Sequence, residues 1–295
     1  MENSQLNISE QIQINFNDGT STLIDKRIGE LISNSENNPK LLPFFYDISQ
    51  SLQKYSDYFI NFYTYLLLNR KKSKSQIFQD LFVLFNFNEK RNGTFLEFGA
   101  SDGFSFSNTY LLENSYGWTG VLAEPNPEWY ENLNKNRPNC KIIKECIYTK
   151  SGEDLDFFVS NIGVGSTIKK FRYSDAKSMP GNAKARNLAG YTTKIQSISL
   201  NDVFIKYFNS SPIDYMSVDT EGSELEILRN FDFKKFGPSI LTVEHNKTDE
   251  EKHIDELLMI NGYIRYFKEH TQFDGWYILQ KWFFNIKLIL IIKVF

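Results

Sequence analysis

Cysteine is scarce in this sequence: the 295 residues contain two, Cys140 and Cys146. On one predicted strand, residues 141–145 with its flanks, these two would lie roughly 20 Å apart, beyond the reach of a disulfide. Free thiols are typical of a reducing compartment, and residues 1–18 lack the apolar segment of a secretory signal. We therefore expect a cytoplasmic protein.

The sequence also lacks an excess of positive charge. It has 33 lysines and arginines against 36 acids, a net charge of -3 and a pI near 5.8. This balance provides no basic surface for a polyanion, so we expect no nucleic-acid partner. The apolar tail, residues 282–295, is too short and too interrupted by lysine to span a bilayer. It suits covering the sheet, or touching a partner or a membrane surface.

Apolar and aromatic residues, by contrast, are plentiful, at 41% and 16%. A chain of this size and composition can bury a large core. In residues 41–69 the aromatic and aliphatic side chains recur mostly at intervals of three and four, which predicts a helix with a wide apolar stripe. The stripe suits an N-terminal cap or a homodimer contact. We expect a polar segment with a helical cap over 1–72, a main domain over 73–281 and the tail over 282–295.

Within 73–281, apolar strand patterns alternate with helical ones, which predicts an α/β Rossmann-like domain with helices on both faces of a mostly parallel sheet. The carboxyl ends of parallel strands then form one ligand-binding rim. Residues 154–159 and 193–198 read as edge or lid strands, and 161–187 as an irregular lid or binding loop. The seven predicted strands of the sheet are 94–98, 120–124, 141–145, 213–218, 239–243, 263–268 and 273–280.

The stretch T-F-L-E-F-G-A-S-D-G, residues 94–103, runs from an apolar strand into a glycine-rich turn. A pyrophosphate-binding turn needs a glycine between Gly99 and Gly103, but Ser101 stands there, and Glu97 would repel a pyrophosphate. Glu124 follows at about the 20-residue spacing of a ribose-binding acid. A nucleoside cofactor with cationic groups, S-adenosylmethionine, fits this arrangement, whereas an ordinary strand–helix turn explains the glycines without any ligand.

Six motifs occur in order: S-Q-I-F-Q-D-L, F-L-E-F-G-A-S-D-G, A-E-P-N, E-C-I-Y-T-K-S-G-E, V-D-T-E-G-S-E-L-E-I-L and V-E-H-N. With them the chain resembles the FkbM family of S-adenosylmethionine-dependent methyltransferases over roughly residues 75–246. The resemblance implies a class I methyltransferase fold with a seven-stranded sheet. It also implies O-methylation of a hydroxyl, most often on a sugar or a polyketide-type natural product. Family members commonly read D-I-G-A-N-x-G at the first motif, where this chain has Glu97 and Ser101.

By position in these motifs, the resemblance places the methionine end of the cofactor at the turn after the first strand. It assigns both ribose hydroxyls to Glu124 and the adenine to the 145–147 segment. A carboxylate is a bidentate acceptor suited to a cis-diol, and a sulfonium favours a site with acids and few bases. The cofactor site we predict comprises Glu97, Gly99, Ala100, Ser101, Gly103, Glu124, Pro125, Glu145, Cys146 and Asp219.

For the chemistry we expect His245, directly after the strand 239–243, to act as general base with Asp219 across the rim. A packed, purely structural histidine is the alternative. Asp219 would otherwise hold the cofactor's ammonium, or join Glu221 and His245 around a divalent metal. This set offers few oxygen ligands for a divalent ion, so we assign no metal.

Two other functions fit the same sequence features. One is a non-catalytic nucleoside- or sugar-binding module that keeps this fold, because a retained Glu124 beside an inactive acceptor pocket would look the same in sequence. The other is a nicotinamide-dependent sugar oxidoreductase, which the missing pyrophosphate glycine disfavours.

Overall fold

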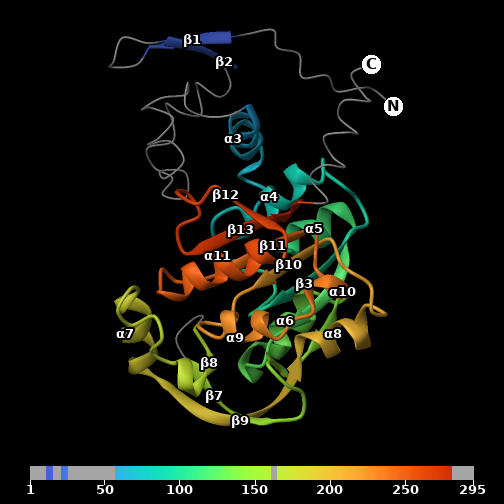
Figure 1. The fold of residues 1–295 in the computed structure, drawn as a ribbon, viewed down its shortest axis with the longest axis vertical. Coiled ribbons are helices and arrows are strands. Elements are labelled where there is room, and N and C mark those ends of the chain that lie inside the picture. Colours follow the sequence, from blue (N-terminus) through green and yellow to red (C-terminus); the bar gives the residue numbers. More distant parts are fainter. Residues whose placement is uncertain (1–10, 16–20, 26–56, 161–164, 281–295) are drawn as a thin grey trace.

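The computed structural model describes residues 11–15, 21–25, 57–160 and 165–280. Its centre is a seven-stranded sheet with the strand order β12-β13-β11-β10-β3-β4-β5 (Figure 1). The strands are β3 (Thr94–Phe98), β4 (Thr119–Ala123), β5 (Lys141–Ile143), β10 (Tyr215–Val218), β11 (Ile240–Glu244), β12 (Tyr263–Tyr266) and β13 (Asp274–Leu279).

All neighbouring strands from β11 to β5 are parallel, and β13 alone runs antiparallel to its neighbours β11 and β12. This arrangement confirms the predicted seven-stranded, mostly parallel sheet. In the register of the sheet, Glu97 lies beside Ser217 of β10 and Leu122 of β4. The carboxyl ends of β3, β4 and β10 therefore finish at nearly the same level and form one rim.

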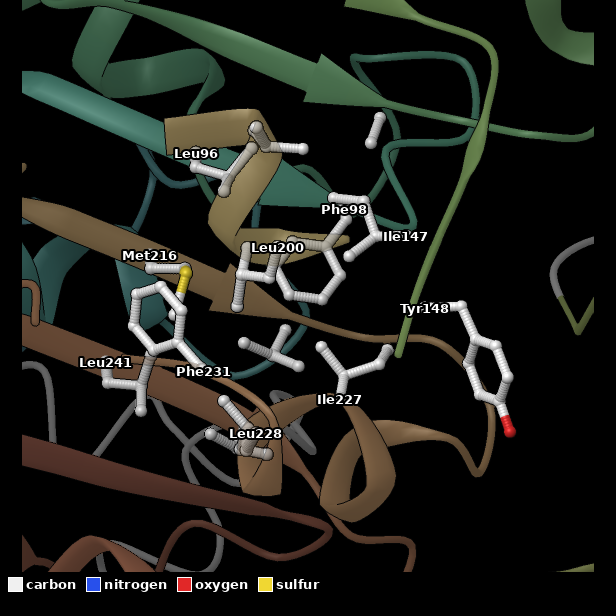
Figure 2. Packing of buried hydrophobic residues seen from close by; sticks show 14 of the residues in the cluster. Leu96, Phe98, Ile147, Tyr148, Leu200, Met216, Ile227, Leu228, Phe231 and Leu241 are labelled. Atoms are coloured by element: carbon white, nitrogen blue, oxygen red, sulfur yellow. The ribbon is translucent and has the colours of Figure 1, made fainter. Parts of the chain in front are cut away.

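Helices cover both faces of the sheet, as expected. Side chains alternate along each strand: in β3, Phe95 faces one apolar cluster whereas Leu96 and Phe98 face the other. The first face is covered by α3 (Asp57–Asn69), α4 (Gln79–Asn86), α5 (Tyr110–Tyr116) and α6 (Tyr130–Asn136). The second is covered by α8 (Leu200–Tyr207), α9 (Glu224–Arg229), α10 (Phe233–Phe236) and α11 (Glu250–Ile260). Figure 2 shows the apolar cluster on the second face, in which Leu96, Met216 and Leu241 of the sheet pack near Leu228 of α9.

The aromatic stripe was predicted over residues 41–69, of which 41–56 lie outside the described residues. Its remaining part forms the buried face of α3. Phe62 is fully buried, and its ring centroid lies 4.8 Å from that of Phe267, 5.8 Å from that of Phe82 and 6.1 Å from that of Trp276. The extension is thus helical where it adjoins the main domain, and it shares the core of the sheet. Further towards the N-terminus, the alternating segments β1 (Gln11–Asn15) and β2 (Ser21–Asp25) pair antiparallel.

A second sheet of four strands, in the order β6-β9-β7-β8, was not predicted. It lies with α7 at the end of the molecule opposite α3 (Figure 1). Long alternating stretches pair here: β7 and β9 are antiparallel over seven residue pairs. The elements are β6 (Cys146–Tyr148), β7 (Asp154–Ser160), β8 (Thr167–Ile168), the 3-10 turn η4 (Lys169–Phe171), α7 (Pro180–Leu188) and β9 (Gly190–Ser199).

Two predicted segments are corrected by this sheet. The strand expected over 141–145 ends at Ile143, because the chain leaves the central sheet there and, two residues later, pairs as β6 with β9. The segment 161–187, expected to be irregular, contains β8, η4 and most of α7, whose start is fixed by a proline in its first turn. Another 3-10 turn, η3 (Pro127–Trp129), precedes α6.

Both cysteines are free thiols, as expected: Cys140 is half-buried and Cys146 is buried at the start of β6. Among the residues that the structure describes, no helix is both long and apolar enough to cross a membrane. The tail 282–295 lies outside the described residues.

The packing of α3 can be tested by truncating one buried ring. Phe62→Ala should lower the free energy of unfolding by about 3–5 kcal/mol, because it opens a cavity inside the aromatic cluster. Leu68→Ala on the same helix, at a side chain that is 39% exposed, should cost less than about 1 kcal/mol. Denaturant unfolding of both variants measures the difference, and equal losses would contradict the packing of α3 in the core.

Candidate active site

The glycine-rich turn after β3 is pressed against the end of β10. Gly99 has a φ of 80°, and a Cβ added there would lie 2.0 Å from the backbone oxygen of Asp219. Gly103 has a φ of 73°, and its Cβ would meet Arg137 and Leu133 at 2.6 Å. Glycine is therefore needed at both positions for conformation and for space. Ser101, between them, also lies in the left-handed region, with a φ of 48°.

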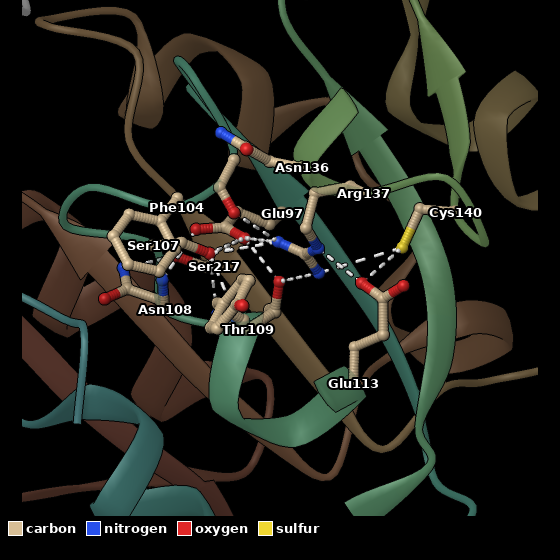
Figure 3. Close-up of polar contacts among 12 residues, drawn as sticks. Glu97, Phe104, Ser107, Asn108, Thr109, Glu113, Asn136, Arg137, Cys140 and Ser217 are labelled. Carbon is tan, nitrogen blue, oxygen red and sulfur yellow. Dashed lines mark hydrogen bonds and ion pairs between the residues drawn. The ribbon is translucent and has the colours of Figure 1, made fainter. Parts of the chain in front are cut away.

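Glu97 is buried and holds this turn in place (Figure 3). Its carboxylate accepts hydrogen bonds from the Asn108 backbone at 2.7 Å, from Ser107 Oγ at 3.0 Å and from the Thr109 hydroxyl. The guanidinium of Arg137, 1% exposed, lies 3.7 Å away. Most lone pairs of Glu97 are thus used within the protein, so its main effect on a ligand is through the backbone that it positions.

Arg137 connects this carboxylate to three other segments. Its Nη1 donates to Gly103 O at 3.2 Å and to Ser107 Oγ at 3.1 Å, and its Nη2 donates to Thr109 Oγ1 at 2.9 Å. Its Nε donates to Glu113 of α5. A buried guanidinium with this many acceptors fixes the path of the chain from the turn to α5.

Glu124 lies where β4 ends, as predicted. Its two carboxylate oxygens accept the backbone N–H groups of Ser101 at 2.7 Å and Asn126 at 2.8 Å. Burial raises the pKa of Glu124 to about 7, although these two hydrogen bonds oppose the shift. Each oxygen keeps a further lone pair, so the side chain can still accept two hydroxyl groups.

The rim opens into a pocket with an empty volume of about 980 Å³, a figure that includes space open to solvent. Eight of the ten predicted cofactor residues line it: Glu97, Gly99, Ala100, Ser101, Glu124, Pro125, Cys146 and Asp219. Gly103 packs beneath Arg137 instead, and half-exposed Glu145 points toward Lys206, 3.9 Å away. Neither of these two is among the described residues that line the pocket.

Sequence reasoning missed Asn108, which lines the same pocket. Its Nδ2 donates to Ser217 Oγ at 2.9 Å, whereas its buried Oδ1 has no hydrogen-bond partner among the described residues. A buried acceptor without a donor is costly unless a ligand supplies one. Asn108 follows an irregular loop, and neither periodicity nor glycine marked it.

Three carboxylates meet where β10 and β11 end. Asp219, Glu221 and Glu244 each place an oxygen within 4.8 Å of the other two. Burial, with added repulsion from neighbouring acids, raises the pKa values of Asp219 and Glu244 well above their usual range. Burial likewise raises the pKa of Glu221 to about 7, opposed by Arg186, whose Nη1 lies 3.0 Å from Glu221 Oε2. The structure brings Glu244, which was not predicted, into this group. Its sequence signal was its place in the V-E-H-N motif at a strand end, directly before the histidine.

His245 is placed elsewhere. It is buried and does not line the main pocket among the described residues. Its Nδ1 accepts the Lys247 backbone N–H at 3.1 Å, and its Nε2 lies 3.1 Å from Arg265 Nη2. Burial lowers the pKa of His245, and Glu251 opposes that shift. Successive side chains of a strand point to opposite sides, so with Glu244 facing the pocket, its neighbour faces away.

A sequence model of the FkbM methyltransferase domain matches residues 97–272. The chain belongs to the FkbM methyltransferase family. Comparison with curated proteins gives no match. As a member of the FkbM family it is a methyltransferase that uses S-adenosylmethionine, which confirms the predicted cofactor.

Several solved methyltransferase structures are similar to the chain at low identity. A human methyltransferase 10 domain-containing protein is 13% identical, with 77% of this chain and 97% of that chain covered and a TM-score of 0.39. A TehB-like S-adenosylmethionine-dependent methyltransferase from Corynebacterium glutamicum is 8% identical (73% and 95% covered, TM-score 0.37). Fibrillarin from Aeropyrum pernix, solved with natively bound S-adenosylmethionine, is 13% identical (64% and 66% covered, TM-score 0.31). The fold assignment of this FkbM-family chain rests on its own strand order and on the family match.

The position of His245 gives a clear expectation for its removal. His245→Ala should lower the free energy of unfolding by about 1–3 kcal/mol, because Lys247 N–H and Arg265 lose a buried partner. S-adenosylmethionine affinity and the methyl-transfer rate per folded molecule should stay within a few-fold of wild type. Thermal unfolding, calorimetric titration and a rate measurement on the folded fraction check this. A drop of 10²-fold or more in rate at normal stability would restore the role of general base predicted from the sequence.

Proposed function

We propose that this FkbM-family methyltransferase transfers the methyl group of S-adenosylmethionine to a hydroxyl of a small molecule. The acceptor class that we propose is a sugar of a glycan or glycoconjugate, or a hydroxylated natural product. The observation that carries this proposal is the meeting of two hollows at the Asp219–Glu221–Glu244 carboxylates.

The second hollow, with an empty volume of about 500 Å³, shares four lining residues with the main pocket: Gln76, Gly165, Glu221 and Glu244. Its remaining walls come from α7, the end of β11 and the loop before β13, and include Asn182, Arg186 and Asn246. Amide and guanidinium donors of this kind suit a ligand rich in hydroxyl groups. An acceptor bound there would reach the cofactor at the carboxylates.

The main pocket has groups for each part of the cofactor. The ionised carboxylate of Glu124 can accept both ribose hydroxyls, and the free Oδ1 of Asn108 can accept from the ammonium of the methionine moiety. The apolar side chains Cys146, Ile147 and Phe157 line the part of the pocket that we assign to the adenine. The excess of acids over bases around Asp219 favours a sulfonium cation.

In the reaction, the acceptor oxygen attacks the methyl carbon, the O–CH3 bond forms and the S–CH3 bond breaks, so that S-adenosylhomocysteine leaves. The hydroxyl proton passes to a carboxylate of the cluster, with Asp219 as the proposed acceptor. A carboxylate with a raised pKa is a better base near neutral pH than an ordinary one, and alignment of the reacting atoms supplies much of the remaining acceleration. The free thiols of Cys140 and Cys146 fit the cytoplasm, which we propose as the location.

A methyl-transfer assay with labelled S-adenosylmethionine tests the function. Purified protein is offered monosaccharides, glycans and polyketide-type alcohols, each paired with the analogue that lacks the hydroxyl. Asp219→Asn should lower the rate at saturating cofactor by about 10²- to 10⁴-fold, because it removes the proton acceptor but keeps the side-chain shape. Glu226→Gln, on the outer side of α9, is the matched control and should be near wild type. Label found on a nitrogen or sulfur acceptor, with none on hydroxyls, would refute O-methylation.

Cofactor affinity should depend on pH through Glu124. Because the pKa of this group is about 7 in the free protein, it is protonated below that pH, and binding to two ribose hydroxyls favours the ionised form. Affinity should therefore fall by up to about tenfold per pH unit below 7 and level off above it, with proton release on binding near neutrality. Neighbouring Cys146 and Tyr130, whose pKa values burial raises to about 12, do not titrate in this range. Glu221, which lines the same pocket with a pKa of about 7, does titrate there.

Calorimetric titrations in two buffers of different ionisation enthalpy measure the released proton. Glu124→Ala should weaken S-adenosylmethionine binding by roughly 1.5–3 kcal/mol while the fold is kept, and it should remove the part of the pH dependence that comes from Glu124. Any dependence that stays near pH 7 is then assigned to Glu221. The interval from about pH 5.5 to 8.5 covers the pKa values that a buried glutamate can have. If the wild-type affinity for S-adenosylmethionine stays constant over this interval, Glu124 does not bind the ribose.

A further inference from the structure

Three carboxylates gather where the two hollows meet. Asp219 and Glu244 stand at the ends of adjacent strands, β10 and β11, and Glu221 reaches them from the turn before α9. Their oxygens lie within 4.8 Å of one another. The carboxylates of Glu224 and Asp274 add to the repulsion felt by Glu244.

Cationic side chains compensate little of this charge. Arg186 is the base that reaches the cluster, and it divides its guanidinium between Glu221 and Asp175. Arg265 pairs with Glu251 and Asp255 on α11 instead. Among the described residues, no ion pair links Asp219 or Glu244 to a base. Glu244 is buried and Asp219 and Glu221 are half-buried, and like charges at this separation favour the binding of protons or of a cation.

Glu244 provides an independent observation. The side chain is 7% exposed and lines both hollows, yet its Oε2 has no hydrogen-bond partner among the described residues. A buried carboxylate oxygen normally has a donor, and one without any is expected where a ligand completes the site. The neighbouring amide donors do not serve it: Asn246 Nδ2 lies 3.4 Å from Glu221 Oε2, and Gln79 donates to Asp274. The Glu244 carboxyl does share a side-chain hydrogen bond with Asp219, which belongs to the same cluster.

The spacing of the three oxygens fits a metal ion. Two ligands on opposite sides of a calcium ion lie at most about 4.6–5.2 Å apart, and those of a magnesium ion about 4.0–4.2 Å apart. The three carboxylate oxygens lie within 4.8 Å of one another, which is inside the span of a calcium site. This upper bound exceeds the span of a magnesium site by less than 1 Å. Oxygen ligands of this type favour magnesium, calcium or manganese over zinc or copper.

We propose that Asp219, Glu221 and Glu244 bind one divalent cation at the junction of the cofactor and acceptor hollows. In the ligand set considered from the sequence the third member was His245. In the structure Glu244 takes that place, so all three ligands are carboxylates. Water and an acceptor oxygen would complete the coordination. A 2+ ion reduces the charge of the three carboxylates from -3 to -1 and gives the free Oε2 of Glu244 a partner.

The consequence for the reaction rests on the proposed function. A hydroxyl bound to the cation is more acidic and is held toward the methyl group. Its proton then passes to a carboxylate oxygen that faces away from the ion, since each carboxylate has two. Acceptors with two neighbouring hydroxyls, which can chelate the ion, would be preferred over those with one.

Manganese provides a direct probe because free and bound Mn²⁺ differ in their electron paramagnetic resonance signal. The full-length chain, stripped with a chelator and desalted, should bind one Mn²⁺, and Mg²⁺ or Ca²⁺ should displace it. Glu244→Gln and Asp219→Asn should each weaken binding at least tenfold, while the control Glu226→Gln should bind like wild type. Both site variants remove a buried like charge at constant volume, so their metal-free melting temperatures should equal or exceed that of wild type. Mn²⁺ should raise the melting temperature of wild type more than that of either site variant.

No binding by wild type up to about 10 mM, ten times the weakest typical calcium constants, would overturn the proposal. Unchanged binding by Glu244→Gln would place the ion elsewhere and would overturn it as well. Calorimetry with S-adenosylmethionine in chelator separates this result from the proposed function. Cofactor binding and methyl transfer without any metal effect would remove the cation alone, whereas Mn²⁺ binding without methyl transfer to any hydroxyl would remove the proposed acceptor class alone.

Discussion

The buried pair of Glu97 and Arg137 is the interaction on which the site depends. Two charges taken out of water are costly, and here they are compensated because hydroxyls, a backbone oxygen and a second carboxylate, Glu113, satisfy them. The pair joins the end of β3 to the chain that follows α6 and to the start of α5. The turn between these elements therefore has one conformation, which presents Ser101 N–H to Glu124 and packs Gly99 on Asp219. The protein's own contacts thus shape the pocket that we propose for the cofactor, which would lower the entropic cost of binding there.

The rim of the sheet divides its acids by what their surroundings provide. Glu97 has a guanidinium and hydroxyls, and Glu124 has two backbone donors. Asp219 and Glu244 have mainly each other, and burial makes their charged forms unfavourable. Glu97, whose oxygens the protein satisfies, positions the chain, and Glu124 keeps lone pairs free for a ligand. Acids without donors are the ones suited to hold protons or external cations. This difference in partners, rather than the number of acids, separates the structural part of the rim from the reactive part.

Much of the central architecture could be read from the sequence because it depends on local patterns. Apolar runs followed by turn residues marked the strands, and the spacing from Gly103 to Glu124 marked the end of β4. The second sheet could not be read in the same way. The segments β6 and β9 pair across some fifty positions of the chain, and nothing local in Cys146–Tyr148 distinguishes a continuation of β5 from a strand of another sheet. The antiparallel pairing of β7 with β9 also brings together the two ends of the segment between them, whose composition is typical of a loop.

Glu244 and His245 show that residue type alone does not identify a site residue, because the direction of the side chain must also be known. Both stand at the carboxyl end of β11, and histidine is the more familiar base near neutral pH. Alternation along the strand allows only one of the two to face the pocket, and the sequence does not say which. Packing decides it: β13 and α11 lie beside the end of β11, and Arg265 with its acidic partners Glu251 and Asp255 gives a polar but closed environment that accepts the imidazole. The pocket side then receives the carboxylate, and with it a site whose chemistry depends on what neutralises the charge.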